Sequence, residues 1–306
     1  MPTPIFHDRR QSVEGVRSFS QSASKPARFV ELMQHYAYHN YRSSGPCLHG
    51  VTPITKEDMY LVHSKGYIDE LFALATPNGF GNYDPRIPES CLWTVGSLLS
   101  AARWSMANQH TPACSPVSGF HHASHKEAAG FCSVNGIMIV AAKLLAENPD
   151  LKVAILDLDY HLPDGTLDIL HRFPVLEKQI LHISNGEHWL ELSDTRPWFA
   201  WLQKSIERIN AFKPDLVIYQ AGADMHADDL LDGFLSTQEL VLRDRMVFRE
   251  IKAPVVFDLA GGYQDNPSGD PFLDPVLAIH RNTLRESDLS IPVRKQKLKE
   301  KSNGNP

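Results

Sequence analysis

The sequence predicts an α/β fold in which one parallel sheet is covered by helices on both faces. From about residue 134 to 260, helical patterns alternate with short apolar runs, which is typical of β-α-β units. The apolar runs lie at 153–158, 180–184, 215–220 and 254–259 and have the length expected of buried strands. A chain of 306 residues, of which 42% are hydrophobic, can bury the core of a single domain.

Helices are expected before and between these strands. A polar, Ser-rich stretch at 8–28 leads into a first helix near 26–38, because Pro26 suits a first helical turn. Thr55 and Asp58 resemble a capping box that opens a short helix. Further helical patterns run through about 66–75, 88–107, 134–147, 197–212 and 236–250. We expect one domain over 1–285 and a basic, flexible tail over 286–306.

Composition and charge exclude several classes of protein. The net charge of −6 gives no case for binding to nucleic acid or to an anionic membrane. There is no apolar run of about 18 residues that would span a membrane, and the N-terminus lacks a signal-peptide core. The cysteines are scattered without a CxxC pair, so we expect reduced thiols and a cytoplasmic setting.

The most informative stretch is Asp157–Thr166, which continues the apolar run at 153–158. Asp159 and His161 are two residues apart in an extended segment, so their side chains point the same way. A second carboxylate, Asp224, follows another apolar run. An Asp/His/Asp set leaves a coordination position for water, as catalytic zinc sites do. The sequence therefore predicts a metallohydrolase.

Two adjacent histidines, His121 and His122, lie on a loop that begins at Gly119. Adjacent imidazoles can reach one water, where one acts as base and then acid while its neighbour stabilises charge. Each imidazole needs a partner on its other nitrogen, and Asp157 and Asp164 are the candidates. Alone, a His-His pair is more often structural than catalytic.

A tyrosine follows two glycines in the segment Gly261-Gly262-Tyr263. Glycines allow a loop to bring the phenol close to a reacting carbonyl, where it can donate to a developing oxyanion. Alone, this segment is an ordinary turn.

Together these motifs resemble the zinc-dependent histone deacetylase family, which includes bacterial histone-deacetylase-like amidohydrolases and acetylpolyamine amidohydrolases. The resemblance rests on His121-His122, Gly130-Phe131-Cys132, Asp157-x-Asp159-x-His161, Gly222-Ala-Asp224 and Gly261-Gly262-Tyr263, in that order. Pro26-Ala-Arg28 and Met59–His63 are similar to the family's amino-terminal pattern, so the resemblance covers about residues 26–285.

The resemblance implies an arginase-like fold with a central parallel sheet of about eight strands. It implies zinc held by Asp159, His161 and Asp224, with His122 as general base and acid and His121 as its electrostatic companion. Asp157 would pair with His121, Asp164 with His122, and Tyr263 would bind the substrate carbonyl. A structural potassium ion would lie at Asp157, at backbone carbonyls of Asp159 and His161, and at Ser184.

The implied reaction is hydrolysis of an acyl amide, typically an acetyl amide, on a primary amine such as acetyl-lysine or an acetylpolyamine. Gly130 and Phe131 would form one wall of the channel that holds the alkyl chain of this substrate. The opposite wall is expected from His188 or Trp189. The sequence leaves the choice of amine and the oligomeric state open.

The chain departs from the family pattern near the metal motif. Leu162 and Pro163 stand where the family has His and Gly. Proline fixes φ near about −65° and lacks an N–H, so Asp164 is expected to be displaced if that glycine needs a positive φ. Pro116–Phe120 replaces the usual Arg-Pro-Pro-Gly, and Ala260 replaces a Glu.

Two alternatives follow from these departures. A catalytically impaired module on the same fold would bind acyl-lysine without hydrolysing it. A ureohydrolase with two metal ions would need Asp-x-His-x-Asp, but residue 163 is Pro where the last Asp would stand.

Overall fold

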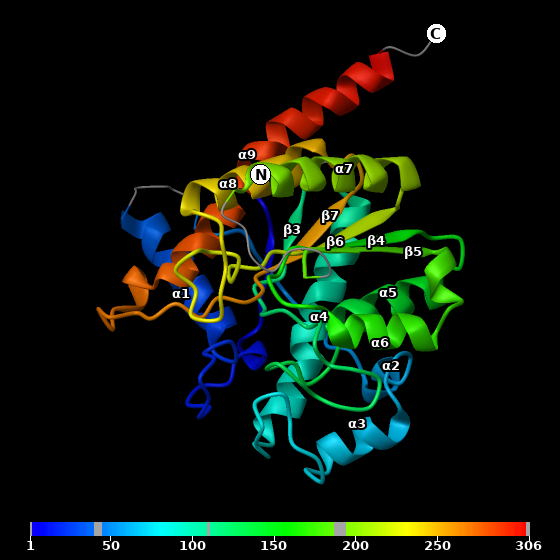
Figure 1. The fold of residues 1–306 in the computed structure, drawn as a ribbon, viewed down its shortest axis with the longest axis vertical. Helices are drawn as coiled ribbons and strands as arrows, with labels where there is room; N and C mark the ends of the chain where they lie inside the picture. Colours follow the sequence, from blue (N-terminus) through cyan, green and yellow to red (C-terminus); the bar gives the residue numbers. More distant parts are fainter. Residues whose placement is uncertain (1, 40–44, 109–110, 187–193, 304–306) are drawn as a thin grey trace.

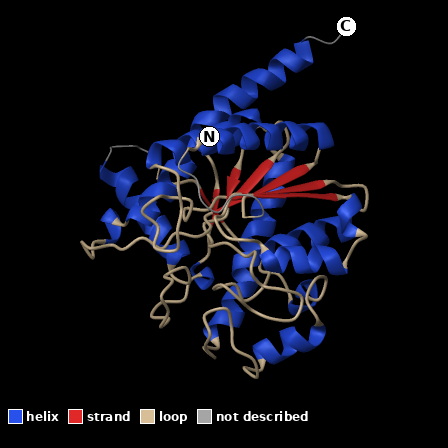
Figure 2. Cartoon of the chain, in the orientation of Figure 1, coloured by secondary structure: helices blue, strands red, loops and turns tan. Residues whose placement is uncertain are grey.

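The computed structural model describes residues 2–39, 45–108, 111–186 and 194–303. Their strands form one parallel sheet in the order β2-β1-β3-β7-β6-β4-β5, seen as the red fan in Figure 2. The strands are β1 (Ile5–Phe6), β2 (Leu48–His49), β3 (Ala113–Cys114), β4 (Val153–Asp157), β5 (Ile180–Ser184), β6 (Leu216–Gln220) and β7 (Val255–Asp258).

Helices cover both faces of this sheet (Figure 1). They are α1 (Lys25–His39), α2 (Lys56–Met59), α3 (Lys65–Phe72), α4 (Arg86–Ala107), α5 (Gly136–Glu147), α6 (Asp164–Arg172), α7 (Arg196–Phe212), α8 (Thr237–Glu250) and α9 (Pro275–Asn303). Short 3₁₀ helices lie at Arg9–Gln11, Leu176–Lys178 and Pro271–Leu273. None of the described helices is apolar enough over a sufficient length to cross a membrane.

The alternating side chains of β4 show why the sheet is buried on both faces. Val153 and Ile155 pack into the core beneath α4 and α5, whereas Ala154 and Leu156 pack into the core beneath α7 and α8. Successive residues of a strand point to opposite faces, so a strand between two helical layers must be apolar throughout. This confirms the prediction of an α/β fold with a parallel sheet.

The sheet differs from the expectation in its number of strands. The described residues form seven strands, where about eight were expected. The four longer strands, β4, β5, β6 and β7, lie where the apolar runs predicted them. The other three, β1, β2 and β3, are only two residues long, which is too short for a periodic pattern.

The expected tail from residue 286 lies within α9, which runs from Pro275 to Asn303. Glu286 and Arg294 are 3% and 5% exposed, and the guanidinium of Arg294 donates to the carbonyls of Phe248 and Ile251 at 3.0 and 2.8 Å. A buried arginine therefore closes the carboxyl end of α8, and only the last part of α9 projects from the body (Figure 1).

The parallel arrangement gathers polar side chains at one edge of the sheet. Asp157 ends β4 and lies opposite Ser184 of β5 and Gln220 of β6, and Gln220 in turn lies opposite Asp258 of β7. Loops that follow neighbouring parallel strands meet at this edge, which is where such folds bind ligands.

Candidate functional site

The predicted metal ligands come together beyond the ends of β4 and β6. The Nδ1 atom of His161 lies 3.2 Å from Asp159 Oδ1 and 2.9 Å from Asp224 Oδ2. One ligand atom from each of the three residues lies within 4.8 Å of the others. Asp159 and Asp224 are buried and His161 is half-buried. The three residues therefore form a compact group that is open on the side of the imidazole.

Electrostatics of this group favour a bound cation. Burial raises the pKa of Asp224 well above its usual value, and the charge of Asp159 adds to the shift. Burial would also raise the pKa of Asp159, but the charge of His121 and the hydrogen bond from His161 outweigh it and lower the pKa. The neighbouring carboxylates shift in opposite directions because two buried like charges cannot both ionise unaided.

One oxygen of the triad has no protein partner. Asp224 Oδ1 is buried and accepts no hydrogen bond from the described residues. A buried carboxylate oxygen normally has a partner, and a divalent cation at the triad would supply one and relieve the repulsion between the carboxylates. The donor set, two carboxylates and one imidazole with a free position, suits zinc.

Each histidine of the predicted dyad has its own carboxylate. His121 Nδ1 donates to Asp157 Oδ2 at 2.9 Å, and His122 Nδ1 donates to Asp164 Oδ1 at 2.7 Å. Burial would lower the pKa of His121, but the charges of Asp157 and Asp159 outweigh it and raise the pKa to about 9. The ring centroids of His121 and His122 are 4.1 Å apart.

The turn at Leu162-Pro163 does not displace Asp164. Pro163 directly precedes α6, which begins at Asp164, and the Asp164 amide donates to Leu162 O at 2.9 Å. At the next residue, a Cβ on Gly165 would lie 2.4 Å from the carbonyl oxygen of Ala123. Helix α6 therefore packs directly against the histidine loop, and this packing brings the Asp164 carboxylate to His122.

Two buried side-chain amides, for which no sequence motif predicted a role, hold the histidine loop. Gln220 donates to Asp157 Oδ1 and accepts the amide N–H of Phe120, each at 3.0 Å. The side chain of Asn135 donates to the carbonyls of His121 and Ala123 at 3.4 and 3.2 Å. The available signal was a polar residue that ends an apolar strand, as Gln220 does, or that caps a helix, as Asn135 does.

Tyr263 lies beside the triad. Its ring centroid is 6.3 Å from that of His161 and 5.6 Å from that of Phe131. Gly261 has a φ of +54°, and a Cβ there would lie 2.5 Å from Asp224 Cγ, so only glycine allows this approach. Burial raises the pKa of the Tyr263 phenol, which keeps it protonated as a donor.

The structure describes the residues expected to form one wall of the channel, but not those expected to form the other. Phe131 is half-buried beside Tyr263, and a Cβ on Gly130 would lie 2.3 Å from the His122 ring. Gly130 therefore packs closely against the dyad. His188 and Trp189, expected to form the opposite wall, lie outside the described residues.

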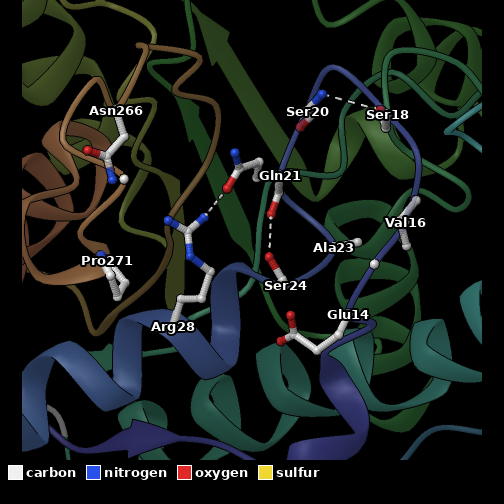
Figure 3. A pocket seen from close by; sticks show the side chains of 12 residues that line it. Glu14, Val16, Ser18, Ser20, Gln21, Ala23, Ser24, Arg28, Asn266 and Pro271 are labelled. Atoms are coloured by element: carbon white, nitrogen blue, oxygen red, sulfur yellow. Dashed lines mark hydrogen bonds between the residues drawn. The ribbon is translucent and has the colours of Figure 1, made fainter.

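A cavity of about 580 Å³ lies beside this group rather than in it. Figure 3 shows Arg28 between the loop that precedes α1 and the segment near Asn266, with its guanidinium donating to Gln21 at 2.6 Å. A second cavity of about 140 Å³ shares Gln21, Arg28 and Asn266 with the first and reaches Tyr263. The two hollows are therefore adjacent at the tyrosine side of the site.

Comparisons with known proteins agree with this geometry. The histone deacetylase domain model matches residues 22–188 and 188–270. Acetylpolyamine amidohydrolase of Mycoplana ramosa is 25% identical over 282 residues, which cover 71% of this chain and 80% of that one. Histone deacetylase clr6 of Schizosaccharomyces pombe is 26% identical over 227 residues, which cover 61% and 55%.

A solved structure supports the same fold. Acetylpolyamine aminohydrolase from Burkholderia pseudomallei superposes with a TM-score of 0.71 at 16% identity, covering 94% of this chain and 99% of that one. The chain spans only 55 to 65% of the length of several curated relatives. Because the domain model matches most of its length, the chain belongs to the histone deacetylase family.

Proposed function

We propose that this protein is a zinc-dependent deacylase that hydrolyses an acyl amide, in the simplest case an acetyl amide, on a primary amine. The observation that carries the proposal is the convergence of the open Asp159/His161/Asp224 group with the paired histidines. Relatives named as a histone deacetylase and an acetylpolyamine amidohydrolase support the substrate class, acetyl-lysine or an acetylpolyamine.

The triad would hold one zinc ion, for which the unpaired Asp224 oxygen offers a ligand. When bound, zinc supplies Lewis-acid activation of the amide carbonyl and of the attacking water. The buried carboxylates lose their mutual repulsion in that state. Both carboxylates and the imidazole are therefore assigned to the metal.

His122 would serve as the general base and then as the general acid. Asp164 accepts its Nδ1–H, which leaves Nε2 free to take a proton from water and to return it to the leaving amine. His121, held by buried Asp157, would stabilise charge beside it. The Tyr263 hydroxyl would donate to the developing oxyanion.

A potassium ion would occupy a second position, beside Ser184 and Asp157. These residues face each other across β4 and β5, and the buried Ser184 hydroxyl has no hydrogen-bond partner among the described residues. Backbone carbonyls at Asp159 and His161 would complete the site. The unpaired oxygen is the observation that favours an ion of this kind here.

A reducing compartment is part of the same proposal, because all the described cysteines are free thiols. We place the protein in the cytoplasm on that ground.

The decisive experiment measures acetate released by zinc-reconstituted protein from an acetyl-lysine peptide and from N-acetylputrescine, with Asp159→Ala as the control. Turnover of either substrate that is lost in the variant is the expected result. Preference for the peptide indicates a protein deacetylase, and preference for the diamine indicates a polyamine deacetylase. Bound zinc with no turnover of these or of longer acyl amides would contradict the proposal and favour an acyl-lysine-binding module.

A further inference from the structure

Lys25 is a buried cation behind the tyrosine loop, and neither the sequence motifs nor the proposed mechanism uses it. It is the first residue of α1 and is 4% exposed. Its Nζ donates to the carbonyls of Leu259 and Gly261 at 2.8 and 2.5 Å and to Ser118 Oγ at 3.3 Å. One ammonium therefore joins the loop that carries Tyr263 to the segment that leads into the histidine dyad.

Asp229 binds the same loop through a backbone N–H, whereas Lys25 binds it through backbone carbonyls. Its Oδ2 atom accepts the amide N–H of Tyr263 at 2.7 Å, and its Oδ1 atom accepts the amide N–H of Leu231 at 3.0 Å. Asp229 is 8% exposed. The carbonyls before Tyr263 are thus bound by a positive charge, and its amide is bound by a negative charge.

The Tyr263 loop depends on contacts from other segments, because two of its residues are glycines. Gly261 and Gly262 both have positive φ, +54° and +92°, and glycine is the residue with the greatest backbone freedom. Hydrogen bonds to charged groups are stronger than those between neutral groups. A buried ammonium is costly unless its donors are satisfied, and here it donates to three acceptors, Ser118 Oγ and the carbonyls of Leu259 and Gly261.

We propose that Lys25 and Asp229 are positioning residues that hold the Tyr263 loop in place over the metal triad and in register with the histidine dyad. This inference rests on the proposed function, because it assigns the two residues to the reaction through Tyr263. Neither residue touches the reacting atoms.

The kinetic test is a double-mutant cycle between Lys25→Met and Tyr263→Phe. We expect Lys25→Met to lower kcat about 10- to 100-fold, with KM and zinc content near wild type, as loss of a supporting contact does. In the Tyr263→Phe background the same change should cost less than about threefold, because coupled residues are not additive. Full additivity would overturn the proposal, as would an unchanged kcat for Lys25→Met.

Matched variants separate positioning from loss of stability. Lys25→Arg keeps a cation and should recover part of kcat. Phe29→Leu removes buried volume from the same helix without removing any hydrogen bond of Lys25 and should leave kcat near wild type. Asp229→Ala should behave as Lys25→Met does, whereas Asp228→Ala, whose side chain is 85% exposed, should not. Asp229→Ala also keeps the test decisive if Lys25→Met does not fold.

A readout without turnover distinguishes failure of this inference from failure of the proposed function. Hydrogen–deuterium exchange of a peptide spanning 259–265 should be faster in Lys25→Met and in Asp229→Ala than in wild type, and unchanged in Phe29→Leu. Unchanged exchange in both variants would overturn the anchoring role even in an active enzyme. If exchange is faster in these variants but the wild-type protein has no deacylase activity, the anchoring role of Lys25 and Asp229 is supported and the proposed reaction is contradicted.

Discussion

His122 Nδ1 donates to Asp164 Oδ1 at 2.7 Å, although Asp164 directly follows the Leu162-Pro163 turn. The Asp164 side chain is 56% exposed, whereas Asp157, the partner of His121, is 1% exposed. The two histidines of the dyad therefore sit in unlike surroundings. The side chain of His121 is 3% exposed within its pair, whereas that of His122 is 19% exposed beside the exposed Asp164 carboxylate.

Asp164→Asn should lower kcat about 10- to 100-fold, because the amide no longer favours one His122 tautomer or its protonated form. KM and zinc content should stay close to wild type. The measurement is kcat across pH, with Glu147→Gln as the control, since that carboxylate pairs with Arg103 away from the histidine loop. An unchanged kcat would show that His122 does not depend on Asp164.

Asp224→Asn should reduce zinc stoichiometry and abolish turnover, because it removes a charge from a three-residue metal group. Elemental analysis after dialysis against a defined zinc concentration checks the first effect. Asp228→Asn, a nearby exposed carboxylate, should retain full zinc content. Chelation of the wild-type protein should remove activity, and added zinc should restore it. Full zinc occupancy in Asp224→Asn would reject the assignment of this ligand.

Tyr263→Phe should lower kcat about 10² to 10³-fold, as loss of one oxyanion donor does. Zinc content and the midpoint of urea unfolding should not change, because no described hydrogen bond of the phenol supports the fold. Steady-state kinetics on the better of the two acetylated substrates provide the measurement. A variant with wild-type kcat would remove Tyr263 from the mechanism.

Acid should destabilise the fold through His63. This imidazole donates to Ser124 O at 2.8 Å and accepts the Asn135 amide at 2.9 Å, and burial lowers its pKa to about 4 from 6.5. Between these values the unfolded chain binds a proton that the folded chain does not, so stability falls as pH falls from 6.5 towards 4. The full effect is roughly 3 kcal/mol.

The variant His63→Gln isolates the contribution of His63 to the pH dependence of stability. Urea unfolding of both proteins at pH 7 and pH 5, with chelator present, gives the loss of stability for each. Wild type should lose more than the variant on acidification, although the variant should be less stable at pH 7. Equal losses would show that His63 does not titrate as its burial requires.

The metal group could be predicted because its residues lie in short sequence patterns that follow apolar strands. Asp159 and His161 are two residues apart at the end of a strand, and Asp224 follows a second strand, so spacing and parallel pairing bring them to one edge. The four longer strands, β4 to β7, could be predicted for the same reason, since each is a continuous apolar run. The strands of two residues, β1, β2 and β3, have no such pattern.

The chain alone therefore predicts the α/β class and the residues that we propose carry the chemistry, because both appear as short patterns in the sequence. Only the folded molecule shows that Asp164 reaches His122 despite Pro163, that Arg294 is buried in α9, and that Lys25 and Asp229 hold the Tyr263 loop. Lys25 meets Gly261 across 236 positions of sequence. Contacts of that kind arise from the packing of distant segments, and no local spacing encodes them.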